Sequence, residues 1–256
     1  MTPVKLACDE SLSSTVVGEF CEREGIAFAT GLEDEDLALL KLQDSALSLL
    51  IPSVAKKPFS LDFVSGKAAY RKHRPAKGKE PIAKACGLKS NLRPLIIDAT
   101  AGFLSDSLVL AGLGAEVIAI EQHPLVYLLA KDALGRFSES GAEESERLHL
   151  HYGTAQSLLS DLNTLLEGRA MEQGVVLYLD PMFPLEQKKQ KSQVKVPMQI
   201  LRALETRAEP EESYLELMKA YAFERVVVKR PRWAEPLAGK TPRYSIETKQ
   251  NRFDVY

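Results

Sequence analysis

Residues 95–106 read LIIDATAGFLSD, and this stretch decides the fold of the chain. Its apolar start, Leu95–Asp98, ends in an acid and lacks the alternation of a half-buried strand, which predicts a strand buried on both faces. A turn of small residues follows, and Ser105–Leu113 has the character of a helix. A strand, a glycine-containing turn and a helix in this order are typical of the ligand-binding unit of an open α/β sheet.

The chain beyond this stretch repeats the alternation. Strands are expected at Val117–Ile120, Leu148–Tyr152, Val175–Asp180 and Arg225–Lys229, with helices at Pro124–Phe137, Ala155–Leu166 and Ser213–Tyr221. Two last strands, Tyr244–Thr248 and Arg252–Tyr256, are expected to pair as an antiparallel hairpin. Strands that alternate with helices predict a parallel sheet covered on both faces.

The first 90 residues have shorter apolar runs. Strands are expected at Val4–Ala7, Leu37–Leu42 and Ala46–Ile51, and helices near Ser14–Glu24, at Gly66–His73 and at Pro81–Cys86, with a loop at Pro75–Lys79. We therefore predict two units, an N-terminal α/β region at residues 1–90 and a catalytic domain at residues 91–256.

Composition narrows the class of protein. The chain of 256 residues has no apolar run near the roughly 20 residues that cross a bilayer. It begins without the basic flank and apolar run of a signal peptide. The three cysteines are widely spaced and fit neither a zinc ribbon nor a disulfide framework. We expect a cytoplasmic protein without a membrane anchor or a metal site, and the sequence does not indicate its oligomeric state.

Basic residues are unevenly distributed, although the net charge is only −2. The segment from Lys67 to Lys89 contains eight basic residues and one acid, and two more basic clusters follow at Lys188–Lys195 and Lys229–Arg232. If the fold brings the clusters together, they predict a polyanionic partner. For any single cluster, a solvated surface face is the alternative.

Three strand ends carry residues suited to binding a ligand, because ligands bind beyond the carboxyl ends of parallel strands. The first holds Asp98 and Gly102 and leads to Asp106, the second ends at Glu121, and the third continues as Asp180-Pro181-Met182-Phe183. Taken alone, each acid fits a helix or turn cap equally well. Their order and spacing favour one shared site.

The glycine pattern discriminates between cofactors. A dinucleotide fold needs GxGxxG so that a pyrophosphate can lie against the helix, and here only Gly102 is present. This loop suits a ligand without phosphate, such as S-adenosylmethionine (SAM), with Glu121 accepting hydrogen bonds from its ribose diol. An NAD-dependent oxidoreductase is the disfavoured alternative.

The third strand end indicates the reaction. An exocyclic amine on a base is a poor nucleophile because its lone pair is delocalised into the ring. The Asp180 carboxylate and the Pro181 carbonyl can accept hydrogen bonds from such an amine and align it, while Phe183 can stack on the base. The motif therefore favours methylation of nitrogen over oxygen or carbon.

Several strings together resemble one known family, the bacterial ribosomal RNA small subunit methyltransferase J family. They are DFVSGKAAYRKHR (62–74), IAKACGLK (82–89), DATAGFLSD (98–106), YLDPMFP (178–184), RVVVKRP (225–231) and RFDVY (252–256). The resemblance implies a class I SAM-dependent methyltransferase fold, which is Rossmann-like with a seven-stranded, mostly parallel sheet. It also implies methyl transfer to N2 of one guanosine in 16S rRNA, free or in the small ribosomal subunit.

The resemblance also implies roles for single residues. Cofactor contacts carry over to Ser105, Asp106, Glu121, Gln122, Gly153, Thr154 and Asp180. Contacts with the rRNA carry over to Lys67, Arg71, Lys72, Arg74, Lys188, Lys189, Lys229 and Arg230. The chain departs from the family pattern at four positions: Leu104 replaces a glycine, Ser105 an arginine, Gln122 a common arginine and Gly153 a common serine.

Two further functions stay open at this point. The Asp-Pro-x-Phe turn also serves enzymes that methylate adenine N6 or a protein amide. A non-catalytic RNA-binding assembly factor would fit if the changes at Leu104 and Ser105 mark a degenerate cofactor loop.

Overall fold

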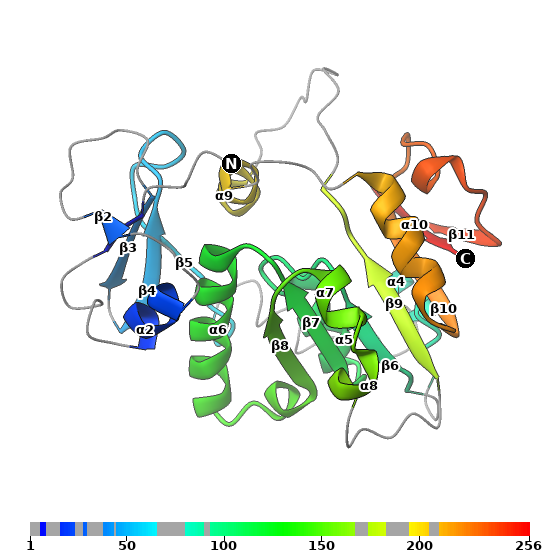
Figure 1. The fold of residues 1–256 in the computed structure, drawn as a ribbon, viewed down its shortest axis with the longest axis horizontal. Coiled ribbons are helices and arrows are strands. Elements are labelled where there is room, and N and C mark those ends of the chain that lie inside the picture. The colour runs from blue at the N-terminus through cyan, green and yellow to red at the C-terminus, as the bar shows by residue number, and fades with distance from the viewer. Residues whose placement is uncertain are drawn as a thin grey trace.

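The computed structural model describes residues 6–8, 16–23, 28–29, 38–43, 45–65, 80–89, 93–166, 174–182, 195–204 and 210–256. Within these ranges the chain forms two sheets, a five-stranded one near the N-terminus and a seven-stranded one that contains the predicted strand ends. Figure 1 shows the small sheet on one side of helix α6 and the large sheet on the other.

The large sheet has the order β11-β12-β10-β9-β6-β7-β8. Its strands are β6 (Leu95–Asp98), β7 (Val117–Glu121), β8 (Leu148–Tyr152), β9 (Val175–Leu179), β10 (Arg225–Pro231), β11 (Tyr244–Glu247) and β12 (Asn251–Val255). Strands β10, β9, β6, β7 and β8 run parallel to one another, and β12 pairs antiparallel with both β10 and β11. The prediction of a seven-stranded, mostly parallel sheet with a final antiparallel hairpin is confirmed.

Alternate residues of the central strands enter two separate apolar cores. Ile96, Val176 and Tyr178 pack in the core that contains α6 (Pro124–Glu139). Leu95 and Ile97 pack in the other core, on the opposite face of the sheet. Both faces are therefore covered, which is why these strands are apolar throughout.

The helices mostly follow the prediction. They are α4 (Pro81–Ala85), α5 (Ser105–Gly112), α6, α7 (Ala155–Leu159), α8 (Leu162–Leu165), α9 (Val196–Leu204) and α10 (Glu211–Ala220). The single helix expected over Ala155–Leu166 is wrong: it is two short helices, and Asp161 Oδ1 accepts the N–H of Thr164 (3.4 Å) at the start of the second. Helix α9 was not predicted.

The small sheet has the order β2-β1-β3-β4-β5. Its strands are β1 (Leu6–Cys8), β2 (Phe28–Ala29), β3 (Ala38–Gln43), β4 (Ala46–Leu50) and β5 (Phe59–Ser60), and α2 (Val16–Arg23) accompanies them. Buried side chains of β4, Leu47 and Leu49, belong to the same apolar core as α6. The two sheets therefore share one core.

Two side chains of α6 also join the sheets by hydrogen bonds. Asp132 Oδ2 accepts the backbone N–H of Leu47 on β4 (3.1 Å). Arg136 donates to the same Asp132 oxygen (2.8 Å) and to the carbonyl of Leu61 (2.7 Å). The carboxylate thus connects β4 of the small sheet to an arginine that itself connects to the loop after β5.

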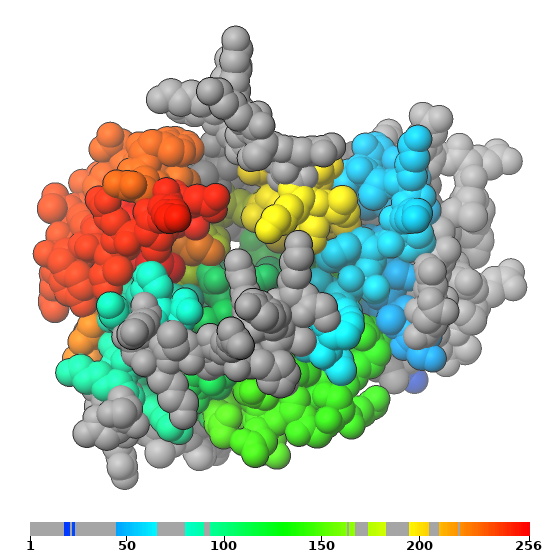
Figure 2. Space-filling view, turned by 180° about the vertical axis from the view of Figure 1, so that it is seen from behind, coloured from blue at the N-terminus to red at the C-terminus, as the bar shows by residue number. Residues whose placement is uncertain are grey.

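The boundary between residues 90 and 91 stays a prediction. Helix α4 precedes that boundary, yet it contacts β11 and β12 of the large sheet. Figure 2 shows its surroundings (teal) against the C-terminal hairpin (red). The helix expected at Gly66–His73 and the loop at Pro75–Lys79 lie outside the described residues. None of the helices that the structure describes is long and apolar enough to cross a bilayer.

The Asp132 junction can be tested by Asp132→Ala. The change leaves the Leu47 N–H and the Arg136 guanidinium without this acceptor, so we expect the free energy of unfolding to fall by about 1–3 kcal/mol. Urea unfolding followed by circular dichroism measures it. Glu139→Ala, at an exposed position of the same helix, should change it by less than about 0.5 kcal/mol. Equal effects of the two variants would contradict the junction.

Candidate active site

The carboxyl ends of β6, β7, β9 and β10 meet at one edge of the large sheet. They bring together Asp98 at the end of β6, Glu121 at the end of β7, and Asp180 directly after β9. Asp106 joins them from the first turn of α5, and Lys229 joins them from β10. The acids that the sequence placed in one site therefore do converge.

Asp98 holds the first loop and the start of α5. Its side chain is buried, and its oxygens accept hydrogen bonds from Ser107 Oγ (2.5 Å) and from the N–H of Thr100 (3.2 Å). Burial raises the pKa of Asp98 to about 7, although the hydrogen bond from Ser107 opposes the shift. The carboxyl group faces the protein interior, so its role here is to anchor the turn.

The loop after β6 contains two residues with left-handed backbone. Gly102 has φ of 52°, and Leu104 has φ of 58°. A glycine adopts this conformation readily, whereas for leucine it costs roughly 1–2 kcal/mol. The Leu104 side chain is 0% exposed, and its burial offsets that cost. The glycine that the resemblance leads us to expect at this position would adopt this backbone without strain, and leucine keeps the same conformation through its packing.

Gly102 lies close to α9. A Cβ built on Gly102 would be in ordinary van der Waals contact with Leu201 Cδ1 of α9, at 3.9 Å, and with the carbonyl oxygen of Thr100, at 4.0 Å. In Figure 2, α9 (yellow) lies between the segment before and around β5 (light blue to cyan) and the C-terminal residues (red). Because glycine has no Cβ, a ligand can approach the backbone here more closely than at a residue with a side chain.

Glu121 ties the second strand end to this loop. Its Oε2 accepts the N–H of Gly102 (2.8 Å), and its Oε1 accepts the N–H of His123 (2.6 Å). The residue is 8% exposed. The backbone N–H groups on both sides orient the carboxylate, which fixes it relative to the glycine turn.

Lys229 lies between two of the acids. Its ammonium donates to Asp106 Oδ2 (2.7 Å) and to Asp180 Oδ2 (2.8 Å). Tyr178, on β9, donates its hydroxyl to the same Asp106 oxygen (2.6 Å). Asp180 is also fixed through its backbone, because its N–H donates to Thr100 Oγ1 (2.6 Å). Four elements, β6, α5, β9 and β10, thus hold one polar cluster.

The charged groups of this cluster shift one another's pKa values. Burial raises the pKa of Asp180, and the neighbouring Asp106 raises it further, whereas Lys229 lowers it. Burial alone would lower the pKa of Lys229, but the two carboxylates outweigh it and the net shift is upward. Burial and the nearby acids also raise the pKa of Tyr178. The lysine is therefore a firmly charged counter-ion, and Tyr178 stays a hydrogen-bond donor.

The remaining predicted cofactor residues line the same edge. Ser105, Gln122 and Thr154 are exposed, and Thr154 Oγ1 accepts the N–H of Ser157 at the start of α7. Gly153 has φ of 145°, and its N–H donates to the carbonyl of Glu121 (3.1 Å). These positions are consistent with a ligand that spans the ends of β6, β7 and β8, and their contacts stay a prediction.

Several expected residues lie outside the described ranges: Phe183, Lys67, Arg71, Lys72, Arg74, Lys188 and Lys189. Pro181 is described and buried. In the part of the chain that the structure describes, no group of three His, Cys, Asp or Glu side chains could hold a metal ion.

Two of the expected RNA contacts have polar partners within the fold, and their contact with RNA stays a prediction. Arg230 is 3% exposed and its Nη1 bonds Glu211 Oε1 (2.8 Å), so its guanidinium is engaged inside the fold. Lys229 bonds the two acids of the site, as described above. Consecutive residues of a strand point to opposite faces, so Lys229 and Arg230 have different surroundings. The sequence shows only two adjacent basic residues and does not show which face each one occupies.

Sequence reasoning missed Thr100, Ser107 and Tyr178 as members of the site. Only one of them had a usable signal: Tyr178 lies two residues before Asp180, so both side chains are expected on the same face of β9 and its extension. Thr100 and Ser107 are ordinary hydroxyl residues in a turn and a helix, and their partners depend on the tertiary fold.

Comparison with known proteins agrees with this geometry. A family model for SAM-dependent methyltransferases matches residues 21–256. The chain is 39% identical over 213 residues to the ribosomal RNA small subunit methyltransferase J of Thioalkalivibrio sulfidiphilus. This alignment covers 82% of this chain and 80% of that protein. It is 37% identical over 260 residues to the protein of the same name from Photobacterium profundum. This second alignment covers 98% of this chain and 96% of the relative.

A solved structure is similar along the whole chain. The crystal structure of a SAM-dependent methyltransferase from Neisseria gonorrhoeae matches with a TM-score of 0.69 and 30% sequence identity. The match covers 98% of this chain and 95% of that one. The similarity therefore includes both sheets and not the large sheet alone.

The left-handed conformation at Leu104 predicts which of two substitutions at this position is less destabilising. Leu104→Gly and Leu104→Ala both lose a buried side chain, at about 2–5 kcal/mol. We expect the glycine variant to be more stable than the alanine variant by about 1 kcal/mol, because glycine accepts a positive φ. At Leu110, buried inside α5, the order should reverse by a similar amount. Thermal and urea unfolding of the four variants measure both orders, and an alanine variant at least as stable as glycine at position 104 would contradict the assignment.

Lys229→Met tests the shared counter-ion. The variant leaves Asp106 and Asp180 next to each other without a cation, so at pH 8 we expect a loss of about 1–3 kcal/mol in the free energy of unfolding. The loss should shrink at pH 5, because the raised pKa of Asp180 lets it take up a proton and remove the repulsion. Arg147→Met, which breaks an exposed pair with Glu143, is the control and should have little effect at either pH. A loss that does not depend on pH would count against the shared charge.

Proposed function

Because the chain belongs to the ribosomal RNA small subunit methyltransferase J family of SAM-dependent methyltransferases, we propose that it methylates N2 of one guanosine in 16S rRNA. S-adenosylmethionine supplies the electrophilic methyl group. The observation that carries the proposal is the Asp180 carboxylate, which lies at the end of β9 before a buried Pro181 and is held by Lys229. The proposal includes a cytoplasmic location, where the rRNA or the small subunit would be the substrate.

The residues of the first two strand ends fit the cofactor. Gly102 has no side chain and a left-handed backbone, which suits the close approach of a ligand to this turn. The Glu121 carboxylate is held next to it, and a carboxylate has about four acceptor sites for donors such as the hydroxyls of a ribose. Asp106 adds a negative charge for a ligand that carries an ammonium group. Gly102, Asp106 and Glu121 would therefore hold S-adenosylmethionine.

Asp180 is suited to receive the amine. Its Oδ2 accepts from Lys229, whereas no hydrogen bond to its Oδ1 is formed by the described residues. Its backbone is fixed by Thr100, so the carboxylate is preorganised. A hydrogen bond from the N2 amine to Oδ1 would orient the nitrogen lone pair away from the ring plane. The charge on Lys229 lowers the pKa of Asp180 and thereby favours the ionised form, which this acceptor role requires.

Asp180 also provides a place for the proton. A methylated amine carries a positive charge until it loses a proton, and a carboxylate within hydrogen-bond reach can take it. Burial and Asp106 both raise the pKa of Asp180, which makes it a stronger base than an exposed aspartate. Lys229 opposes this shift, so the balance of the two neighbours tunes one group for both tasks.

The substrate part of the proposal rests on the family and on charge. The relatives are named as enzymes of small-subunit ribosomal RNA. A polyanion suits the basic residues between Lys67 and Lys89, and phosphate contacts position a nucleic acid without reading its bases. Base-modifying enzymes take a splayed-out or flipped base, which can reach a carboxylate at a strand end such as Asp180.

Asp180→Asn is the test. The amide keeps the shape but loses the charge and the proton acceptor, so we expect kcat to fall at least about a hundred-fold, as for loss of a general base, with SAM binding retained. The assay is mass spectrometry of N2-methylguanosine in small-subunit rRNA isolated from a strain lacking the gene and treated with the protein. Calorimetry measures SAM binding.

Asp161→Asn is the matched control. Asp161 is an exposed aspartate that caps α8, and asparagine caps a helix equally well. It should leave both readouts unchanged. Wild-type protein that binds SAM but never methylates guanine would favour the non-catalytic RNA-binding function instead. Full turnover by Asp180→Asn would show that the acceptor is another residue.

A further inference from the structure

The single tryptophan of the chain is exposed in the turn that follows β10. Trp233 is 59% exposed, the largest value among the exposed large apolar side chains of the described residues. It belongs to a turn, Pro231 to Ala234, that is closed by a hydrogen bond from the Ala234 N–H to the Pro231 carbonyl (3.1 Å). An indole in this position contributes little to the core and is available for contact.

Strand lengths place this turn beyond the site. The pairing of β10 with β9 ends at Val228 opposite Leu179, but β10 continues to Pro231 through its pairing with β12. Three further residues of strand carry the turn about 10 Å past the carboxyl end of β9. Lys229, at the start of this extension, touches Asp180. A nucleic acid whose base reaches Asp180 therefore passes next to the turn.

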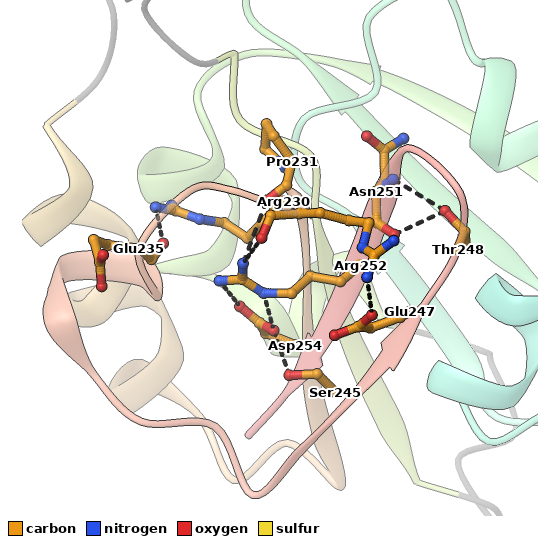
Figure 3. A network of polar contacts seen from close by, with 10 residues as sticks. Arg230, Pro231, Glu235, Ser245, Glu247, Thr248, Asn251, Arg252 and Asp254 are labelled. Carbon is orange, nitrogen blue, oxygen red and sulfur yellow. Dashed lines mark hydrogen bonds and ion pairs between the residues drawn. The ribbon is translucent and has the colours of Figure 1, made fainter.

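Hydrogen bonds from the neighbouring strand β12 hold the turn in place. Arg252 of β12 donates from Nη1 to the carbonyls of Arg232 (2.9 Å) and Pro231 (3.3 Å). Asp254, which is 0% exposed, orients this arginine by accepting from its Nε (2.8 Å) and Nη2 (3.1 Å). Figure 3 shows this network, in which Ser245 also donates to Asp254.

A second arginine fixes the other side of the turn. Arg230 donates to the carbonyl of Glu235, just after the turn, and bonds Glu211 of α10 (2.8 Å). The turn is thus connected to both the hairpin and a helix. A platform that is already ordered loses little conformational entropy when it binds.

The charge next to the indole suits a nucleotide. Arg232, one residue before Trp233, is 52% exposed and pairs with Glu247 (2.6 Å), itself 60% exposed. Surface ion pairs of this kind are worth little, so a phosphate can compete for the guanidinium. An aromatic face next to a cation is the combination with which proteins bind unpaired nucleotides.

We propose that Trp233 stacks on a nucleobase of the rRNA that flanks the methylated guanosine, with Arg232 at a neighbouring phosphate. This inference rests on the proposed function for the identity of the RNA. Stacking on an indole does not depend on the base, so Trp233 positions the strand, whereas the site at Asp180 selects the base that reacts. Trp233 is a positioning residue and takes no part in the methyl transfer.

Intrinsic fluorescence tests the contact directly, because all indole emission comes from Trp233. The probe is an RNA hairpin with the sequence around the methylated guanosine, labelled at its 3′ end so that anisotropy reports binding independently. Stacking should quench the emission in parallel with the rise in anisotropy. Bound RNA with unchanged emission would overturn the proposal.

Kinetics supplies the second readout. We expect Trp233→Ala to raise KM for RNA between about five-fold and one-hundred-fold, while kcat and SAM affinity change less than about two-fold. Trp233→Phe should recover most of the loss. The control is Tyr244→Ala, which removes an exposed aromatic whose hydroxyl contacts Arg225 at the amino end of β10. Equal KM values for wild type and Trp233→Ala would also overturn the proposal.

These experiments distinguish a failure of the proposed methyltransferase function from a failure of the proposed Trp233 contact. Absence of N2-methylguanosine with wild-type protein removes the proposed function, whereas the fluorescence measurement needs no turnover. An effect of Trp233→Ala on intact small subunits, combined with unchanged emission in the RNA complex, would assign Trp233 to a ribosomal protein and overturn the nucleobase contact.

Discussion

One lysine makes the rest of the site possible. Parallel strands and a helix bring Asp98, Asp106 and Asp180 to the same edge of the sheet, and like charges so close repel each other. Lys229 resolves the conflict for two of them with a single ammonium. Burial raises the pKa of the third, Asp98, and so reduces its negative charge, although the hydrogen bond from Ser107 opposes this shift. The positions of β9, β10 and α5 relative to one another are therefore linked through charge as well as through apolar packing.

Most of the large sheet could be predicted because its strands are buried on both faces. Continuous apolar runs that end in an acid identified β6, β7 and β9 and placed Asp98, Glu121 and Asp180 at their ends. The order of elements then required these ends to meet. What could not be predicted is which polar groups bond each other, since Lys229 and Asp106 are 123 residues apart in the chain. Arg230 could not be distinguished from Lys229 in the sequence either. The two residues are adjacent on β10, yet Lys229 bonds Asp180 whereas Arg230 is buried on the other face of the strand.

Local departures from the prediction have local causes. The split between α7 and α8 depends on Asp161, whose side chain starts a new helix where the apolar pattern continues. The change from glycine to leucine at position 104 suggested a degenerate loop, yet the backbone keeps the left-handed conformation and the leucine side chain is fully buried. A substitution in a cofactor loop can therefore conserve the path of the backbone while the side chain moves into the core.

Helix α6 connects the N-terminal sheet to the proposed cofactor site. The helix begins three residues after Glu121 and runs for 16 residues, a rod of about 24 Å. Along its length Asp132 and Arg136 hold β4 and the loop after β5. A rigid rod that is attached to a sheet along one side cannot follow a displacement of that sheet without tilting at its end. The position of the N-terminal sheet is thus coupled through α6 to the segment that carries Glu121.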